Sequence, residues 1–344
     1  MTATDLPDST LEVRLASVPE GLPEPGHFTL SRTPLAAPAP GQVLVRNRHF
    51  LVFPGLRTLI GGRTKGLPLP SLAAGDALFG PAVGEVVAAP GNGPLKPGDT
   101  VVHLAGWRDH ALLPAAEAVP AGDALPTPVA HLAQGAAPYG ALTRPARVRP
   151  GDTVLVAGAA GAVGTLAGQI ARLLGATTVI GTTRSPHKAD RLVRELGYDR
   201  VLLAGPGQRP FAEQLAAAAP DGLDVVLDTV GGEQLTAALD AARPGARVAL
   251  VGALAGQMSA HTAGDRSPAE IDTFGLVVRG ITLTGYSGAD HPGVEEEWTR
   301  RFGAWLRSGE IRFPYTEIEG MHAARAALPE LIAGRHFGAV VVRL

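Results

Sequence analysis

The sequence has no cysteine among its 344 residues, and this absence excludes several kinds of chemistry. Disulfide bonds, thiolate metal ligands and cysteine nucleophiles are all ruled out. The ten histidines are scattered, without an HxxxH or HExxH pair, so a zinc site is not expected. Because 30 basic side chains nearly balance 32 acidic ones, neither nucleic acid nor an anionic membrane is expected as the main partner. We expect a small-molecule ligand instead.

Long hydrophobic runs are also missing, although 45% of the residues are hydrophobic. No apolar stretch approaches the length of a membrane span. The first ten residues, MTATDLPDST, are polar and do not resemble a secretory leader. We therefore expect a cytoplasmic protein, and its length allows two domains with a core each.

The most informative segment is TVLVAGAAGAVG, residues 153–164. A short β-branched strand pattern is followed by a glycine turn and then by an apolar helical pattern. Gly158 permits a tight turn, Gly161 lets a pyrophosphate approach the backbone, and Gly164 lets the helix pack on the strand. The free N–H groups and positive dipole end of that helix suit phosphates. The residues expected to bind a dinucleotide here are Gly158, Gly161, Ala162, Val163 and Gly164.

Strand and helix patterns alternate regularly after the glycine turn. Strands are expected at 177–181, 200–203, 224–230, 247–252 and 281–285, with helices between them. Together with the strand before the turn, they predict a doubly wound parallel sheet of the Rossmann type, and hence an α/β protein.

Before this region, short strand patterns separated by Gly/Pro turns predict a small β-barrel. The last strand pattern, 338–344, is expected to return to that barrel. We place one domain at 1–122 with 308–344 and the nucleotide-binding domain at 123–307.

The end of the second strand of the sheet indicates which nucleotide binds. An acidic residue about 20 positions after the first glycine holds the ribose of NAD, but the segment here contains Thr183 and Arg184, with Lys188 one turn later. Cations at this position suit a 2′-phosphate, so NADP(H) is preferred. The alternative is that both cations only solubilise the start of a helix.

A polar, glycine-containing loop at 257–267 separates the last two strands of the sheet. It is either a cover over a ligand site or a plain surface insertion, and the sequence does not decide between them.

Several motifs together carry a family resemblance over nearly the whole chain. They are PGQVLVRN at 40–47, LKPGDTVV at 95–102, GW at 106–107, APYGAL at 137–142, GAAGAVG, SPHK at 185–188 and DTVGGE at 228–233. The chain resembles the zinc-independent medium-chain dehydrogenases/reductases, above all the prostaglandin reductase, leukotriene B4 dehydrogenase and alkenal double-bond reductase group, with quinone oxidoreductases as near relatives.

The resemblance implies a GroES-like barrel domain, a Rossmann domain, and NADPH as hydride donor in the cleft between them. It implies reduction of a carbon–carbon double bond conjugated to a carbonyl, with an enone or enal as substrate. It also implies that Lys188 binds the 2′-phosphate and that Thr229 and Gly252 line the cofactor.

The sequence departs from the family at several positions. Gly55 and Gln257 stand where tyrosines are common, and the tyrosine contacts expected near Leu203 are absent. His336 and Ala339 replace the asparagine and lysine of an NxGK signature, and His336 is kept among the expected cofactor-binding residues.

Conjugate reduction needs no metal, because hydrogen-bond donors can stabilise the enolate and a side chain or water can protonate it. Tyr139 and Arg57 are the candidate catalytic residues. The alternatives are packing for the tyrosine and an ion pair for the arginine. His49 and Phe53 are the candidate pocket residues.

Other functions stay open at this point. The chain could be a quinone or carbonyl reductase of the same superfamily, or a relative that binds NADPH without turnover. Strand 281–288 resembles an edge strand through which such reductases pair, so we expect a homodimer.

Overall fold

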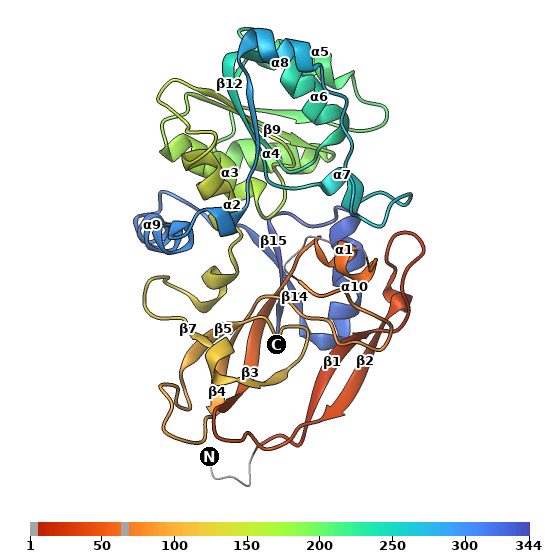
Figure 1. Cartoon of the computed structure of the whole chain (residues 1–344), viewed down its shortest axis with the longest axis vertical. Helices are drawn as coiled ribbons and strands as arrows, with labels where there is room; N and C mark the ends of the chain where they lie inside the picture. The colour runs from red at the N-terminus through yellow and green to blue at the C-terminus, as the bar shows by residue number, and fades with distance from the viewer. Residues whose placement is uncertain (1–5, 63–68) are drawn as a thin grey trace. The chain divides into compact units, whose positions relative to one another are not determined.

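The structure is a computed structural model that describes residues 6–62 and 69–344. Its chain forms two compact units, Met1–Ala133 with Tyr315–Leu344 and Gln134–Pro314 (Figure 1). The helical turn Pro128–Leu132 (η4) contacts β3 and β4 of the first unit, whereas Phe313 packs on Phe302 of the second. These contacts explain why the chain passes from one unit to the other at residues 133/134 and 314/315.

The first unit is rich in antiparallel β-structure. β1 (Ser9–Leu15) pairs with β2 (Phe28–Pro34), and a second sheet has seven strands in the order β14-β15-β3-β4-β5-β7, with β6 also on β3. Its strands are β3 (Gln42–Val52), β4 (Ala82–Ala88), β5 (Thr100–His103), β6 (His110–Pro114), β7 (Val119–Pro120), β14 (Tyr315–Glu319) and β15 (Ala339–Arg343). The expected return of the last strand is confirmed, because β15 pairs antiparallel with β3.

Among the described residues of this unit, two segments form α-helices. They are α1 (Leu56–Ile60) and α10 (Gly320–Ile332), of which α10 packs against β1, β2 and β15. Its buried side chains, such as Met321 and Leu328, contribute to the apolar core of the unit.

The second unit confirms the predicted doubly wound sheet. Six parallel strands run in the order β10-β9-β8-β11-β12-β13. They are β8 (Thr153–Val156), β9 (Thr178–Thr183), β10 (Arg200–Leu203), β11 (Leu223–Asp228), β12 (Ala242–Leu250) and β13 (Thr282–Gly285). The chain builds outward from β8 to β10 and then restarts at β11, so the strand order reverses between β8 and β11. Ligands of such sheets bind outside the carboxyl ends of the strands at this point.

Helices follow each strand of the sheet, and α2 precedes its first strand, β8. They are α2 (Ala136–Thr143), α3 (Gly164–Leu173), α4 (Pro186–Leu196), α5 (Phe211–Ala218), α6 (Gly232–Asp240), α7 (Leu254–Gln257), α8 (Thr273–Arg279) and α9 (Val294–Ser308). The apolar spacing predicts α3, α4, α5, α6 and α9, but not α2, α7 or α8. Side chains such as Ile180 and Val226 of the sheet pack with Leu215 of α5 and Leu235 of α6 to form a buried core. In residues 6–62 and 69–344, no helix is both long and apolar enough to cross a bilayer.

Candidate functional site

The glycine turn, Gly158–Gly164, connects β8 to α3. Gly158 has φ of +69°, and a Cβ there would lie 2.6 Å from Oγ1 of Thr229. A Cβ on Gly164 would lie 2.5 Å from the Cα of Ala159, so only glycine allows α3 to pack this closely. At Gly161 a Cβ would meet no atom closer than the Gly158 carbonyl oxygen at 3.6 Å. The first and last glycines are therefore required by the fold, whereas a Cβ at Gly161 would make only an ordinary van der Waals contact.

Backbone N–H groups at the start of α3 precede the first helix bond. In the described parts of the chain, the N–H groups of Val163 and Gly164 donate to no other residue, and the helix bonds begin with Thr165 N–H to the Gly161 carbonyl at 2.9 Å. Unpaired N–H groups at a helix start, with the positive end of the helix dipole, form an anion-binding arrangement.

Two cations lie at the end of β9. Thr183 ends the strand, Arg184 is exposed, and Ser185 caps α4 by accepting from the N–H of Lys188 at 3.4 Å. The pKa of Lys188 is lowered, first by burial and then by the charge of Arg184. Neighbouring like charges are unfavourable, and a bound anion would relieve the repulsion.

Two residues that the sequence analysis did not identify support the glycine turn. The N–H of Gly158 donates to Oγ1 of Thr182 at 2.9 Å, and that hydroxyl donates to Oε1 of Gln234 at 2.7 Å. Thr182 is buried, and Gln234 lies on α6, 52 residues away in sequence. A hydroxyl inside a strand gives no sequence signal, and nothing in the sequence pattern links Gln234 to the turn.

The structure brings Thr229 and Gly252 next to the glycine turn. The Thr229 hydroxyl donates to the carbonyl of Ala157 at 2.8 Å, and a Cβ on Gly252 would lie 3.0 Å from the Thr229 carbonyl oxygen. Just before Thr229, the buried carboxylate of Asp228 accepts from the N–H of Gly231 at 2.9 Å. Burial raises the pKa of Asp228, and the bonds from the backbone partly offset that rise. The ends of β8, β11 and β12 thus meet at one edge.

Tyr139 lies on α2 and is buried. Its hydroxyl donates to the carboxylate of Glu297, which also accepts from Nη2 of Arg144 at 2.7 Å. The ring packs on Trp298 with centroids 5.9 Å apart. Burial, followed by the bond to Glu297, raises the pKa of Tyr139 to about 12. These contacts tie the hydroxyl to Glu297, and the catalytic role of Tyr139 stays a prediction.

In the first unit, Phe53 directly follows β3 and Arg57 lies on α1. Arg57 is 1% exposed and donates from Nη2 to the carbonyl of Gly21 at 2.8 Å. The ring of Phe53 lies so close to Gly55 and Gly80 that a Cβ on either glycine would be about 3 Å from it. Gly55, which replaces the tyrosine common in the family, thus makes room for the Phe53 ring.

His49 and His336 also lie in the first unit. His49 is on β3 with Nε2 4.0 Å from Glu317, and burial is the main cause that lowers its pKa. His336 precedes β15, and its Nε2 lies 3.2 Å from Glu330. Their expected roles toward substrate and cofactor stay predictions.

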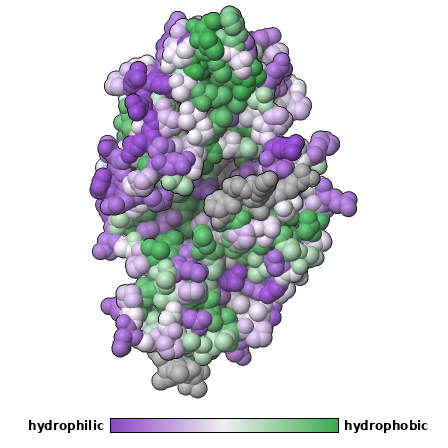
Figure 2. Space-filling view, viewed as in Figure 1, coloured by the Kyte–Doolittle hydropathy of each residue, from purple (hydrophilic) through white to green (hydrophobic). Residues whose placement is uncertain are grey.

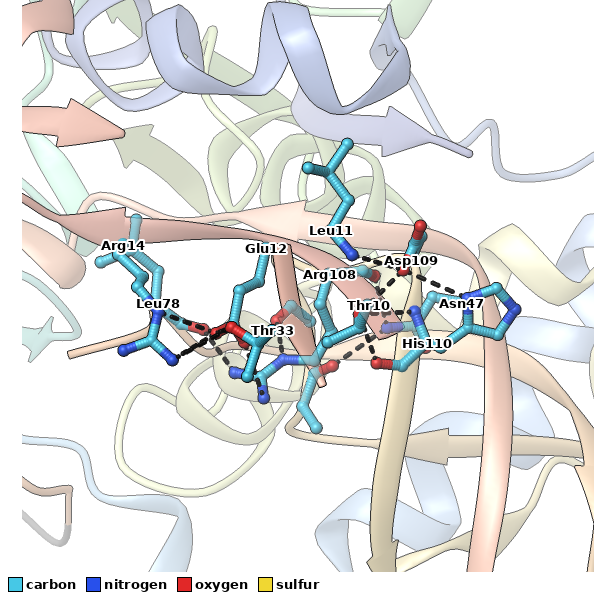
Figure 3. Close-up of polar contacts among 12 residues, drawn as sticks. Thr10, Leu11, Glu12, Arg14, Thr33, Asn47, Leu78, Arg108, Asp109 and His110 are labelled. Atoms are coloured by element: carbon cyan, nitrogen blue, oxygen red, sulfur yellow. Dashed lines mark hydrogen bonds and ion pairs between the residues drawn. The ribbon is translucent and has the colours of Figure 1, made fainter. Parts of the chain in front are cut away.

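A second polar cluster, in the first unit, lies around Arg108 (Figure 3). The buried carboxylate of Glu12 accepts from Nε of Arg14 at 2.8 Å and from the Thr33 hydroxyl at 2.7 Å, and Nη1 of Arg108 lies 3.5 Å away. We call Glu12, Arg14, Thr33, Asn47 and Arg108 the Arg108 network.

The Arg108 network holds a residue with strained backbone. Trp107 is buried with φ of +62° and packs on Phe50 with ring centroids 5.1 Å apart. Nδ2 of Asn47 donates to the carbonyls of Ala105 and Arg108 at 3.0 and 2.8 Å, on both sides of Trp107. A tryptophan at positive φ costs free energy, and these bonds offset that cost. The charged groups of this cluster and Nδ2 of Asn47 thus bond to the protein itself, whereas the buried Oδ1 of Asn47 has no hydrogen-bond partner among the described residues.

Family models match both units of the chain. Residues 12–120 match the N-terminal domain of oxidoreductase, and residues 162–305 match zinc-binding dehydrogenase. Among the described residues, no three histidine, aspartate or glutamate side chains come together as a metal site requires, and the chain has no cysteine. A zinc ion therefore does not fit the residues present.

Curated relatives match over almost the full chain. The NADPH-dependent curcumin reductase of Escherichia coli is 31% identical over 96% of this chain and 95% of its own. Prostaglandin reductase 1 of Rattus norvegicus is 30% identical over 94% and 96%, and the NADP(+)-dependent 2-alkenal reductase of Nicotiana tabacum is 24% identical over 97% of both. The solved structure of CurA from Vibrio vulnificus in complex with NADPH is similar with a TM-score of 0.85 at 27% identity, covering 97% of this chain and 98% of that one.

Proposed function

Since this chain belongs to the medium-chain dehydrogenase/reductase family, we propose that it is an NADPH-dependent reductase of activated carbon–carbon double bonds. Its substrate class is an enone or enal, as the names of the curcumin, prostaglandin and 2-alkenal reductases suggest. The observation that carries the proposal is the set of unused N–H groups at the glycine turn with two cations at the end of the adjacent strand β9.

The residues present fit a phosphorylated dinucleotide. The N–H groups of Ala162, Val163 and Gly164 would bind the pyrophosphate. Arg184 and Lys188 would bind the 2′-phosphate by charge-assisted hydrogen bonds, where a carboxylate would repel it. Thr183, Thr229, Gly252 and His336 complete the set of residues that we propose to contact the nucleotide.

The cofactor supplies the hydride when it is bound. The protein must then hold the developing negative charge on the carbonyl oxygen and provide a path for one proton to the neighbouring carbon. We propose Tyr139 and Arg57 as donors for these tasks, and His49 and Phe53 as walls of the substrate pocket. Much of the rate would come from alignment of the reacting groups, which needs no metal.

The substrate class is tested by comparing NADPH oxidation with an enone, a quinone and an aldehyde side by side. We expect the largest kcat/KM with the enone. A larger value with the quinone or the aldehyde would replace this proposal by the corresponding reductase, and binding of NADPH without any turnover would indicate a non-catalytic protein.

The cofactor is tested by titrating the protein with NADPH and NADH. We expect tighter binding of NADPH, and loss of that preference in the double variant Arg184→Gln, Lys188→Gln. A preference for NADH that survives these substitutions would overturn the assignment.

For Tyr139, the variant Tyr139→Phe separates two roles. A lower kcat with an unchanged melting temperature supports proton or charge transfer by its hydroxyl. Loss of thermal stability with unchanged kcat assigns the hydroxyl to Glu297 alone.

We also propose a homodimer that acts in the cytoplasm, formed through the edge of the parallel sheet. β13 pairs only with β12 among the described strands. On the preceding α8, Phe274, Val277 and Val278 are 74%, 77% and 61% exposed, and an apolar area lies over this part of the second unit at the top of Figure 2. An unpaired edge beside exposed apolar side chains favours pairing with a second copy.

Sedimentation at several concentrations tests the homodimer. We expect the wild-type protein to sediment as a dimer and the variant Val277→Lys to shift toward monomer. The matched control Val193→Lys, on exposed α4, should leave the dimer intact. A wild-type monomer at all concentrations would contradict the proposal.

A further inference from the structure

The segment that begins with α7 lies along the carboxyl edge of the parallel sheet. The N–H of Leu254 donates to the carbonyl of Thr229 at 2.9 Å, and the N–H of Ala255 donates to the carbonyl of Val230 at 3.0 Å. The side chain of Leu254 approaches Gly158, where a Cβ would lie 3.4 Å from its Cδ1. These contacts fix the start of the segment beside the glycine turn.

The same segment reaches the cation pair at the end of β9. Nη2 of Arg184 donates to Sδ of Met258 at 3.6 Å, a contact between residues 74 positions apart. The segment starts from β12, and the sheet order places β11 and β8 between β12 and β9. The segment from β12 to Met258 therefore crosses the ends of β11 and β8 before Met258 contacts Arg184. The strand order reverses between these two strands.

The chemistry of this contact is unusual for an arginine. A thioether sulfur is a weak hydrogen-bond acceptor. A carboxylate at the same place would bind a guanidinium by charge-assisted bonds about twice as strong as neutral ones. Met258 thus orients the Arg184 side chain while leaving its donors available for a stronger acceptor.

We propose that Met258 is a specificity-determining residue for the phosphorylated nucleotide, because it holds Arg184 in place through a contact that a 2′-phosphate can displace. The inference rests on the proposed function, since it concerns the same nucleotide site. It assigns to the 257–267 loop a part in nucleotide selection, which neither a plain insertion nor a simple cover would have.

The test compares Met258→Glu with the matched control Gln257→Glu, which adds the same charge one residue earlier. The dissociation constants of NADPH and NADH are measured by titration of the full-length protein. A glutamate at 258 should pair with Arg184 and repel the phosphate, so the preference for NADPH over NADH should fall about tenfold or more, equivalent to about 1.4 kcal/mol. The control should change it by less than about threefold, as expected for a surface charge without a close partner.

Two further variants show whether Arg184 mediates the effect. Met258→Leu removes the sulfur that accepts from Arg184 and adds no charge, so the preference for NADPH should fall, though by less than in Met258→Glu. In an Arg184→Gln background, Met258→Glu should have little additional effect, because its partner is gone.

The outcomes separate this inference from the proposed function. Equal effects of glutamate at 257 and 258, an unchanged preference in Met258→Leu, or an undiminished effect without Arg184 would each overturn the role of Met258. Failure of the wild-type protein to bind NADPH would instead overturn the proposed function. NADH binding reports in every variant whether the nucleotide domain is folded.

Discussion

The Arg108 network and the glycine turn differ in how their hydrogen-bond donors are used. In the Arg108 network, Arg14, Thr33 and Arg108 gather around one buried carboxylate, and Asn47 binds the backbone on both sides of Trp107. At the glycine turn, the N–H groups of Val163 and Gly164 have no partner in the described protein, and Arg184, which follows β9, donates to a sulfur.

This difference distinguishes polar groups that stabilise the fold from polar groups that are available to bind a ligand. Polar groups that are engaged inside the protein stabilise the fold and hold its backbone. Donors that stay unpaired at the start of a helix contribute little to folding and are available to a ligand. Substitutions in the two regions should therefore affect different measurements.

The largest effect is expected for Glu12→Gln. Removing this charge leaves Arg108, whose pKa is already lowered by burial, without its carboxylate, and breaking a buried pair costs about 3 kcal/mol. The free energy of unfolding, measured by denaturant titration, should fall by that amount. The matched control Glu85→Gln removes a more exposed carboxylate between Arg46 and Arg48 and should cost less than about 1 kcal/mol. An equal loss of unfolding free energy in both variants would show that the Arg108 network stabilises the fold no more than an exposed ion pair does.

The next effect concerns His103, beside the Arg108 network. Its Nδ1 accepts from the N–H of Ala105 at 3.0 Å, and burial, followed by the charge of Arg108, lowers its pKa from 6.5 to about 4. The unfolded chain therefore binds a proton at a higher pH than the folded chain does. The stability that this group contributes is complete above pH 6.5 and is lost as the pH falls from 6.5 to about 4.

Between pH 6.5 and about 4, the free energy of unfolding should fall by about 3 kcal/mol in total because of His103, at about 1.36 kcal/mol per pKa unit. In His103→Asn, which keeps an acceptor for Ala105, the free energy of unfolding should depend less on pH between these values. The exposed His322→Asn serves as the control and should retain the wild-type profile. If the free energy of unfolding of His103→Asn depended on pH as steeply as that of the wild-type protein, another group would be responsible for the pH dependence.

A smaller loss of stability is expected for Thr182→Val. This variant tests the comparison because Thr182 is bonded inside the protein and also supports the glycine turn that would bind the nucleotide. The variant leaves the N–H of Gly158 without its acceptor, which costs about 1–2 kcal/mol of stability. Because the turn itself loses support, NADPH and NADH should both bind more weakly. Thr182→Ser keeps the hydroxyl and should restore both properties, and a selective loss of NADPH alone would contradict the supporting role.

The smallest effect on stability is expected for Arg184→Gln. Because Arg184 is exposed and its contact with Met258 is weak, the free energy of unfolding should change by less than about 0.5 kcal/mol. NADPH affinity should nevertheless fall about tenfold, as for the loss of one charge-assisted hydrogen bond. A destabilisation as large as that of Glu12→Gln would mean that Arg184 serves the fold.

Much of the architecture could be predicted from the sequence because it depends on local patterns. The strand before Gly158 and the helix after Gly164 follow from short-range periodicity and glycine spacing. Counting from Gly158 to the end of the second strand of the sheet also located Thr183, Arg184 and Lys188. α8 was missed, since TFGLVVR exposes its apolar side chains and lacks the one-sided pattern of a buried helix.

The sequence by itself determined the parallel sheet, the glycine turn and the charge at the end of β9, because each depends on neighbours within a few residues. Only the tertiary structure decided which polar groups are paired. The hydroxyl of Tyr139 meets Glu297 158 positions later, Gln234 supports Gly158 through Thr182, and Met258 reaches Arg184. Such contacts depend on how distant segments are brought together in space, and no local pattern encodes them.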